Sequence, residues 1–268
     1  MKFSVLMSLY IKEHPAYLEQ CLNSIKEQTL IPDQIIIVED GPLTKDLYCV
    51  LDNWESKLPI ERVVLKENVG LGVALNHGLK YCSYNIVARM DTDDICYKDR
   101  FEKQVSLVAR GDADICGSWV TEFEESIEII NSYRKLPEHN QDVVTAAKNR
   151  NPLNHPSVVY RKDAILGVGG YDDVRYFEDY HLWLKLIDKG FCFYNFQEPL
   201  VSMRAGNAQL SRRGGVEYAK FELSFFKVCR NEGLMSTYDS LKNSVLRVPL
   251  RLMPRSMLGK VYRVLRKL

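Results

Sequence analysis

Short apolar runs alternate with segments of helical periodicity along the first 110 residues of the chain. Four runs have the apolar or β-branched character of buried strands, and the segments after them carry apolar residues three or four positions apart. The expected strands span 3–9, 34–38, 60–65 and 86–90, and the expected helices span 15–28, 45–57, 71–81 and 100–109. This alternation predicts an α/β fold with a mostly parallel sheet flanked by helices.

The pattern after residue 110 is less regular. We expect strands at 114–120 and 191–196, a strand entered through 154–161, helices at 141–149 and 178–186, a helical turn at 163–166, and an extension or hairpin partner at 126–134. The whole chain of 268 residues is long enough for one large α/β domain, or for one domain with an appendage.

Polar residues stand at the ends of three of the first four expected strands. Ser8 and Tyr10 follow the first, Asp40 follows the second, and Asp91 and Asp93 follow the fourth. Ligands of parallel α/β sheets bind at the carboxyl ends of the strands. We therefore expect these side chains to line one edge of the sheet.

The most acidic stretch is Asp91-Thr92-Asp93-Asp94. Three carboxylates so close together repel one another unless a positive charge lies between them. A hard divalent cation, Mg²⁺ or Mn²⁺, shared with the oxygens of a phosphate ligand is the usual solution. The alternative is a polar loop in which one aspartate caps the following helix.

The near-neutral net charge of +1 hides an asymmetry. Residues 240–268 carry eight Lys or Arg and no Asp or Glu, which leaves 28 basic and 35 acidic residues in the rest of the chain. Leucine and valine interleave with these cations, and Pro249 and Pro254 divide the stretch. The pattern predicts two short amphipathic helices that lie on an anionic membrane surface. Alternatively, the helices pack on the acidic body. Nucleic-acid binding is not expected, because no array of stacking aromatics accompanies the cations.

The cysteine pattern indicates a reducing compartment. Seven cysteines are scattered along the chain without a CxxC pair. The apolar N-terminus is too short for a signal peptide, and no apolar run approaches the roughly 20 residues of a spanning helix.

Six short motifs occur in the order and approximate spacing of a known family. They are 4–10 (SVLMSLY), 38–42 (VEDGP), 68–72 (NVGLG), 88–94 (ARMDTDD), 154–157 (NHPS) and 177–183 (FEDYHLW). In these motifs the chain resembles the family 2 inverting glycosyltransferases with a GT-A fold. More narrowly, it is similar to bacterial enzymes that assemble exopolysaccharide or O-antigen repeat units.

The resemblance implies a division of the chain. Residues 1–213 would form the GT-A domain, with a nucleotide-binding half at 1–110 and an acceptor and catalytic half at 111–213. Residues 214–268 would form a helical extension that is basic and amphipathic from residue 240.

The resemblance also implies a donor site. Asp40 would bind the base of a nucleotide sugar, with Ser8, Tyr10 and Asn68 beside it. Asp91 would hold the ribose and share the metal, Mn²⁺ or Mg²⁺, with Asp93, and Thr92 belongs to the same loop. Many relatives carry an arginine where this chain has Leu75, so Arg89 would supply the positive charge instead.

The implied catalytic base is Asp179, with Glu178 as its neighbour. Inverting transfer needs a base on the face of the sugar opposite the leaving group, so the metal-binding acids cannot supply it. Asp179 lies in a separate segment and suits that geometry. The alternative for both acids is capping of the helix that begins there.

Three further residues are weaker candidates for contacts to the acceptor or the diphosphate. His155 precedes Pro156, but a lone histidine is often structural. Trp183 would stack on an acceptor sugar, or pack in the core. Arg204, with Arg212 and Arg213, flanks a polar loop at 205–211 that would close over the diphosphate, since guanidinium suits phosphate.

The implied reaction is transfer of one sugar from a nucleotide-diphospho-sugar, with UDP as the expected nucleotide, to a hydroxyl of a lipid-linked glycan. The enzyme would work in the bacterial cytoplasm, peripherally on the inner face of the plasma membrane. A nucleotide-sugar-binding protein without turnover would have no need of Asp179. A nucleotidyltransferase would want a glycine-rich N-terminal phosphate loop, which residues 8–12 do not form.

Overall fold

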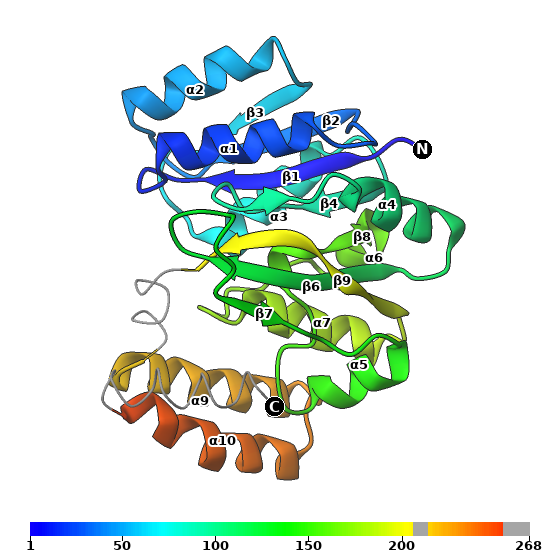
Figure 1. Cartoon of the computed structure of the whole chain (residues 1–268). Helices are drawn as coiled ribbons and strands as arrows, with labels where there is room; N and C mark the ends of the chain where they lie inside the picture. Colours follow the sequence, from blue (N-terminus) through cyan, green and yellow to red (C-terminus); the bar gives the residue numbers. More distant parts are fainter. Residues whose placement is uncertain (206–213, 254–268) are drawn as a thin grey trace.

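The first half of the chain forms a parallel α/β unit, as the alternating pattern predicts (Figure 1). The structure is a computed structural model that describes residues 1–205 and 214–253. Its first four strands lie in the order β3-β2-β1-β4, and each neighbouring pair is parallel. The strands are β1 (Ser4–Leu9), β2 (Gln34–Glu39), β3 (Ile60–Val64) and β4 (Ile86–Arg89), and the helices are α1 (Pro15–Lys26), α2 (Lys45–Glu55), α3 (Leu71–Tyr81) and α4 (Arg100–Arg110).

Successive residues of the central strands face two separate hydrophobic layers. Val5 and Met7 of β1 pack with α1, α2 and α4, whereas Leu6 packs with α3 on the opposite face. This is the period of two that a strand buried on both sides requires. The helices therefore cover both faces and leave the strand ends as the open edge.

The second half of the sheet is mixed. The order continues as β4-β8-β6-β9-β5, and β8 is antiparallel to both of its neighbours. The predicted hairpin partner is confirmed, since β7 pairs with β6 antiparallel. These elements are β5 (Ile95–Cys96), β6 (Ile115–Phe123), β7 (Ser132–Arg134), α5 (Asn140–Ala147), the 3₁₀ turn η1 (His155–Ser157), β8 (Val159–Arg161), α6 (Lys162–Gly167), α7 (Glu178–Asp188) and β9 (Phe193–Arg204).

Strand β9 continues eight residues beyond the predicted end at 196. Its last part pairs with β5, the short strand that follows the acidic stretch. This pairing brings Arg204 beside the end of β4, although the two are more than 100 residues apart in the chain. All seven cysteines are free, as the scattered pattern predicts.

Two C-terminal helices extend the molecule beyond α7 (Figure 1). They are α9 (Val216–Asn231) and α10 (Thr237–Leu252). Phe225 of α9 stacks on Phe177 at the start of α7, with 4.7 Å between ring centroids, and α10 packs on α9. The C-terminal extension is thus held to the body by an aromatic core.

The expected helix break at Pro249 is wrong. α10 runs through this residue as one helix and begins three residues before the predicted start at 240. Pro249 is exposed, so the carbonyl that loses its helical partner can bind water instead. The second predicted helix, after Pro254, lies outside the described residues. None of the helices in 1–205 and 214–253 is long and apolar enough to cross a membrane.

Candidate functional site

The acid loop (91–94) follows β4 and gathers three carboxylates. One oxygen each of Asp91, Asp93 and Asp94 lies within 4.8 Å of the others. Burial, followed by repulsion from Asp91, raises the pKa of Asp93 to about 7. Burial and the charge of Asp93 also raise the pKa of Asp94 well above its ordinary value. This crowded set of oxygen ligands suits a hard divalent cation, which would relieve the repulsion.

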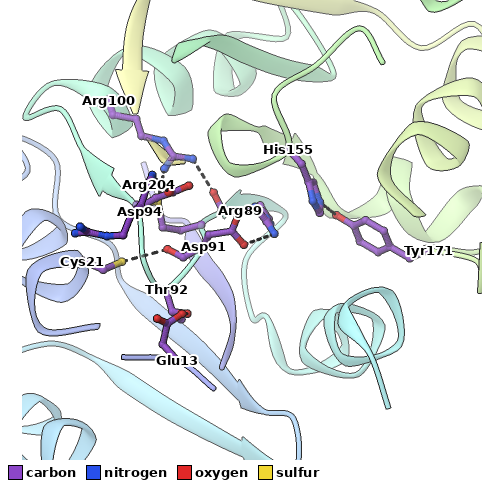
Figure 2. A network of polar contacts seen from close by, with 11 residues as sticks. Glu13, Cys21, Arg89, Asp91, Thr92, Asp94, Arg100, His155, Tyr171 and Arg204 are labelled. Carbon is purple, nitrogen blue, oxygen red and sulfur yellow. Dashed lines mark hydrogen bonds and ion pairs between the residues drawn. The ribbon is translucent and has the colours of Figure 1, made fainter. Parts of the chain in front are cut away.

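Arg89 lies directly behind the acid loop and is almost fully buried (Figure 2). Its guanidinium donates to Asp91, and no other ion pair reaches these three carboxylates within the described residues. Its Nε and one Nη find no hydrogen-bond partner there. Arg100 fixes the backbone of the same strand by donating to the Arg89 carbonyl at 2.7 Å. The loop therefore keeps a surplus of negative charge.

Arg204 and Asp94 join the end of β9 to the acid loop. The backbone N–H of Arg204 donates to Asp94 Oδ1 at 2.8 Å, while Asp94 Oδ2 has no partner in the part of the chain that is described. The Arg204 guanidinium donates to the Asp93 carbonyl at 3.2 Å and lies 3.7 Å from the Tyr17 ring centroid. Arg204 thus lies beside the acid loop, with its donors directed to protein groups, and its contact with the diphosphate stays a prediction. Arg212 and Arg213 lie outside the described residues.

Hydrogen bonds of Thr92 and Cys21 connect the acid loop to the segment after β1 and to helix α1. The Thr92 hydroxyl donates to Glu13 Oε2 at 2.7 Å, and the Cys21 thiol donates to the Asp91 carbonyl at 3.3 Å. The Glu13 carboxylate contributes to the raised pKa of Asp93, so it faces the same space. Thr92 therefore positions the loop and connects it to the segment after β1.

Asp40 is buried at the end of β2 and caps helix α3. Its carboxylate accepts hydrogen bonds from the backbone N–H of Val69 at 2.7 Å, from that of Gly70 at 3.2 Å, and from the Asn68 side chain at 2.9 Å. Gly41 has φ +86°, and a Cβ there would lie 2.8 Å from the backbone nitrogen of Asn68. Asp40 and Asn68 thus lie together, as expected, in a tight turn.

Ser8 and Tyr10 reach the same edge. Ser8 lies opposite Val38 in the parallel register of β1 and β2, and the backbone N–H of Asp40 donates to the Leu9 carbonyl at 2.7 Å. Both side chains are partly exposed. The ends of β1, β2 and β4 therefore converge as the strand pattern predicts.

Helix α7 begins with the two acids predicted to be catalytic. Asp179 Oδ2 accepts from the Asn151 side chain at 2.6 Å, and its Oδ1 accepts from the Tyr180 backbone at 2.7 Å. Burial raises the pKa of Glu178 to about 7, and the neighbouring Asp179 adds to this. Glu178 also accepts from the backbone N–H of Tyr176, a residue with φ +70°. The structure thus orients Asp179 by hydrogen bonds and shields Glu178.

Gly72 allows α3 and α7 to approach closely. A Cβ at Gly72 would lie 3.2 Å from Glu178 Cγ and 3.3 Å from Tyr171 Cβ. The turn capped by Asp40 and the first turn of α7 are therefore neighbours.

Tyr171 lies between the acid loop and α7. Its hydroxyl is 2.9 Å from His155 Nε2 (Figure 2). Burial raises its pKa above the ordinary value, and both Asp179 and Asp91 raise it further. The two acidic groups therefore act on one side chain. Burial and the charge of Arg89 lower the pKa of His155 well below its ordinary value, so its imidazole is neutral.

The prediction of a stacking contact from Trp183 is corrected. Its ring is fully buried in the hydrophobic layer that α7 shares with α3 and the sheet. It packs edge-on to His155, with 6.0 Å between ring centroids. A buried ring offers no face to a sugar, so Trp183 is a core residue. His155 is also buried and lies next to the site through Tyr171.

Sequence reasoning missed three residues of this site. Glu13 and Asn151 lie in loops, and Tyr171 follows a glycine pair that predicts only a turn. Asp94 was predicted as a member of the acidic stretch but was not itself named as a metal ligand.

Comparison with known proteins places the chain among sugar-transferring enzymes. The sequence model described as Glycosyl transferase family 2 matches residues 4–166. The chain is 40% identical to the UDP-Gal:alpha-D-GlcNAc-diphosphoundecaprenol beta-1,3-galactosyltransferase of Escherichia coli, over 98% of this chain and 95% of that protein. It is 43% identical to the amylovoran biosynthesis glycosyltransferase AmsE of Erwinia amylovora, over 84% and 85%.

The backbone is similar to that of a solved glycosyltransferase. The mannosyltransferase PcManGT from Pyrobaculum calidifontis, in complex with GDP-Man and Mn²⁺, superposes with a TM-score of 0.66 at 15% identity, over 99% of this chain and 81% of that one.

Proposed function

Because the chain belongs to glycosyl transferase family 2, we propose that it moves one sugar from a UDP-linked donor to a hydroxyl of a lipid-linked glycan. The expected GT-A fold and the expected enzyme class are confirmed by the family match and the structural likeness. The relative from Escherichia coli is named for a UDP-Gal donor and a diphosphoundecaprenol-linked acceptor, which supports this choice of substrates.

The donor diphosphate would lie at the acid loop. Asp91, Asp93 and Asp94 would hold Mn²⁺ or Mg²⁺, which neutralises charge on the departing diphosphate when bound. The unpartnered, buried Asp94 oxygen and the excess of carboxylates over Arg89 support this fit. Asp40 and Asn68 would face the base, with Ser8 and Tyr10 beside them.

Asp179 would accept the proton of the attacking acceptor hydroxyl. The Asn151 amide holds one of its oxygens, which fixes the direction of the carboxylate. Burial raises the pKa of Glu178 to about 7, so this side chain would take or give a proton more readily than an exposed carboxylate and would hydrogen-bond to the sugars. A base separate from the diphosphate site gives inversion at the transferred carbon.

The acceptor implies a place in the cell. A glycan on a lipid diphosphate is confined to a membrane, so the enzyme would work peripherally on the inner face of the bacterial plasma membrane. The eight cations of residues 240–268 support attraction to anionic lipid.

One observation carries this proposal: the carboxylates of Asp91, Asp93 and Asp94 gather at the end of β4, while Asp179, from the other half of the chain, is held in place by the Asn151 amide. Replacing Asp179→Asn tests it. Turnover with a UDP-sugar and a lipid-diphosphate acceptor should fall about 10²–10⁴-fold, the usual contribution of a general base. Binding of the donor in calorimetry should be unchanged. Normal turnover in this variant would remove the assignment of the base.

A further inference from the structure

Helix α10 presents its polar residues to the protein and its apolar residues to the solvent. Ser240, Asn243 and Arg251 are buried. The Ser240 hydroxyl donates to the Phe226 carbonyl at 3.1 Å, and the Asn243 amide donates to the Lys148 carbonyl at 2.8 Å. An ordinary surface helix has the reverse arrangement, with its apolar stripe against the core.

A buried carboxylate fixes this orientation. Glu222 of α9 is fully buried and forms ion pairs with Arg251 at 2.7 Å and with Arg247 at 2.8 Å. Both arginines therefore point toward the body and neutralise an internal charge. The cations of α10 that the sequence suggested for a membrane surface are, in these two cases, occupied inside the protein.

The outer face of α10 consists of large apolar side chains. Tyr238 is 73% exposed and Val245 is 71% exposed. With them, Leu241, Leu246 and Leu252 complete this outer face, at 55%, 60% and 55% exposure. These five positions fall on one side of a helix with 3.6 residues per turn, opposite the buried polar residues. Contiguous apolar patches of this kind mark interaction surfaces in soluble proteins.

The charge around this face selects its partner. Lys242 lies on the same side, with its ammonium 5.9 Å from the Tyr238 ring centroid and 3.8 Å from the carboxylate of Asp239, with which it forms an ion pair. From residue 240 to the end, the chain contains no acidic residue. A second copy docked symmetrically would bring two such cationic segments together, whereas anionic lipid headgroups would attract them.

We propose that the outer face of α10 inserts into an anionic lipid bilayer. This inference rests on the proposed function, because a lipid-linked acceptor is presented at such a surface. Helices whose apolar face lies in the interfacial region bind in this way. Insertion of the apolar side chains of α10 therefore adds to the attraction between anionic lipid and the cations of residues 240–268.

Helix α9 connects this surface to the catalytic helix. It packs against α10 on one side, and its Phe225 stacks on Phe177 on the other. Phe177 directly precedes Glu178 and Asp179. A bilayer at the outer face thus lies one helix layer away from α7, at the end of the molecule opposite β3 (Figure 1).

Sedimentation with vesicles tests the proposal on the full chain. Wild-type protein should bind vesicles of phosphatidylglycerol and phosphatidylcholine. The double variant Leu241→Asp, Val245→Asp should bind at least about tenfold more weakly, because charge replaces the inserted side chains. The matched control Val64→Asp, at a 66% exposed position on β3, should bind as wild type. Equal binding by wild type and the double variant, or no binding by wild type, would overturn the proposal.

A fluorescent probe at Val245 separates a bilayer from other partners. Val245→Cys is labelled with an environment-sensitive dye in a chain whose more accessible cysteines, Cys49 and Cys192, are replaced by serine. Its emission should shift to the blue only with vesicles, and a probe at Val64→Cys should not respond. A blue shift without vesicles would mean that residues 254–268 or a second copy already cover the face, and would contradict the proposal.

These measurements do not depend on catalysis. The variant Asp179→Asn should bind vesicles as wild type does, even though its turnover is strongly reduced. The double variant on α10 should still use a water-soluble acceptor analogue. Failure of membrane docking and failure of the proposed reaction are therefore distinguishable.

Discussion

Glu222 is fully buried and the acid loop (91–94) is partly buried, but the negative charge of the two regions is compensated differently. Glu222 is paired with two arginines of α10, so its charge is compensated within the protein. In the acid loop, Arg89 pairs with Asp91 and Arg204 lies beside Asp93, yet the pKa values of Asp93 and Asp94 are still raised. The first carboxylate serves to hold two helices together. The second group needs a charge from outside, which is the property of a ligand site.

The largest effect is expected when the ion pairs of Glu222 with its two arginines are broken. Glu222→Gln leaves Arg247 and Arg251 beside a neutral side chain, and removing one partner of a buried ion pair costs about 3–5 kcal/mol. We expect the free energy of unfolding, measured with urea, to fall by this order. Glu217→Gln, at an exposed position of the same helix, is the matched control and should change it little. A loss in the first variant no larger than in the control would mean that α10 is held by its other contacts.

Removing a carboxylate from the acid loop should raise the free energy of unfolding, whereas removing that of Glu222 should lower it. Asp93→Asn removes one of the repelling charges, so the metal-free protein should gain about 1.4 kcal/mol for each pKa unit of repulsion that is relieved. The same variant should lose the increase in melting temperature that Mn²⁺ and UDP give to wild type. Thermal unfolding with and without Mn²⁺ measures both effects. Lower stability without metal would show that Asp93 is part of a compensated network like Glu222.

The contrast between these two regions was only partly visible in the sequence. The acid loop could be predicted because its members are adjacent in the chain and follow an apolar strand, so local pattern and strand order suffice. The orientation of α10 could not, since it depends on Glu222, which belongs to another helix about 25–29 residues away. The interleaved leucines and arginines of α10 predict an amphipathic helix but not which of its faces is buried.

The site residues divide in the same way, into those placed by strand order and those placed by contacts between distant parts of the chain. Ser8, Asp40 and Asp91 were predicted to converge because parallel strands end at one edge. Tyr171 and Asn151 reach the site through contacts across long stretches of chain, and neither follows a strand. β8 is antiparallel to both of its neighbours, and the chain reaches it after the β6–β7 hairpin, helix α5 and the turn η1, a path that no local pattern predicts. Trp183 fits the helical period of a core position as well as that of a surface one, so only the structure could decide.

The pH dependence of stability should sharpen the comparison further. The pKa of Asp93 is raised to about 7 from 3.8, so the folded protein binds a proton that the unfolded chain does not bind between these values. This group should therefore make the metal-free protein more stable as the pH falls from 8 toward 5, with a limiting slope of about 1.4 kcal/mol per pH unit. Asp94, whose pKa is also raised, acts with the same sign, and His155, whose pKa is lowered, acts with the opposite sign below its ordinary pKa.

Glu178 contributes with the same sign, since its pKa is raised from 4.5 to about 7. Urea unfolding of wild type and Glu178→Gln across this range separates the two groups. Mn²⁺ should remove the contribution of Asp93 to the pH dependence of stability and leave the contribution of Glu178. A pH profile of Glu178→Gln that Mn²⁺ leaves unchanged would mean that Asp93 is already compensated in the folded protein.

The smallest expected effect concerns the side chain that lies between the acid loop and α7. Tyr171→Phe keeps the ring in the core but removes the hydroxyl that bonds to His155. Loss of one buried hydrogen bond costs about 0.5–1.5 kcal/mol, and the neutral imidazole is left without this partner. We expect kcat to fall by roughly 2- to 10-fold with little change in donor affinity, because the hydroxyl bonds to the buried His155 and not to a group of the proposed nucleotide site. Steady-state kinetics and donor calorimetry measure the two quantities. His155→Phe should reproduce the change in kcat if the hydroxyl acts through its bond to the imidazole, whereas a loss of donor affinity in Tyr171→Phe would make the hydroxyl a direct ligand of the nucleotide sugar.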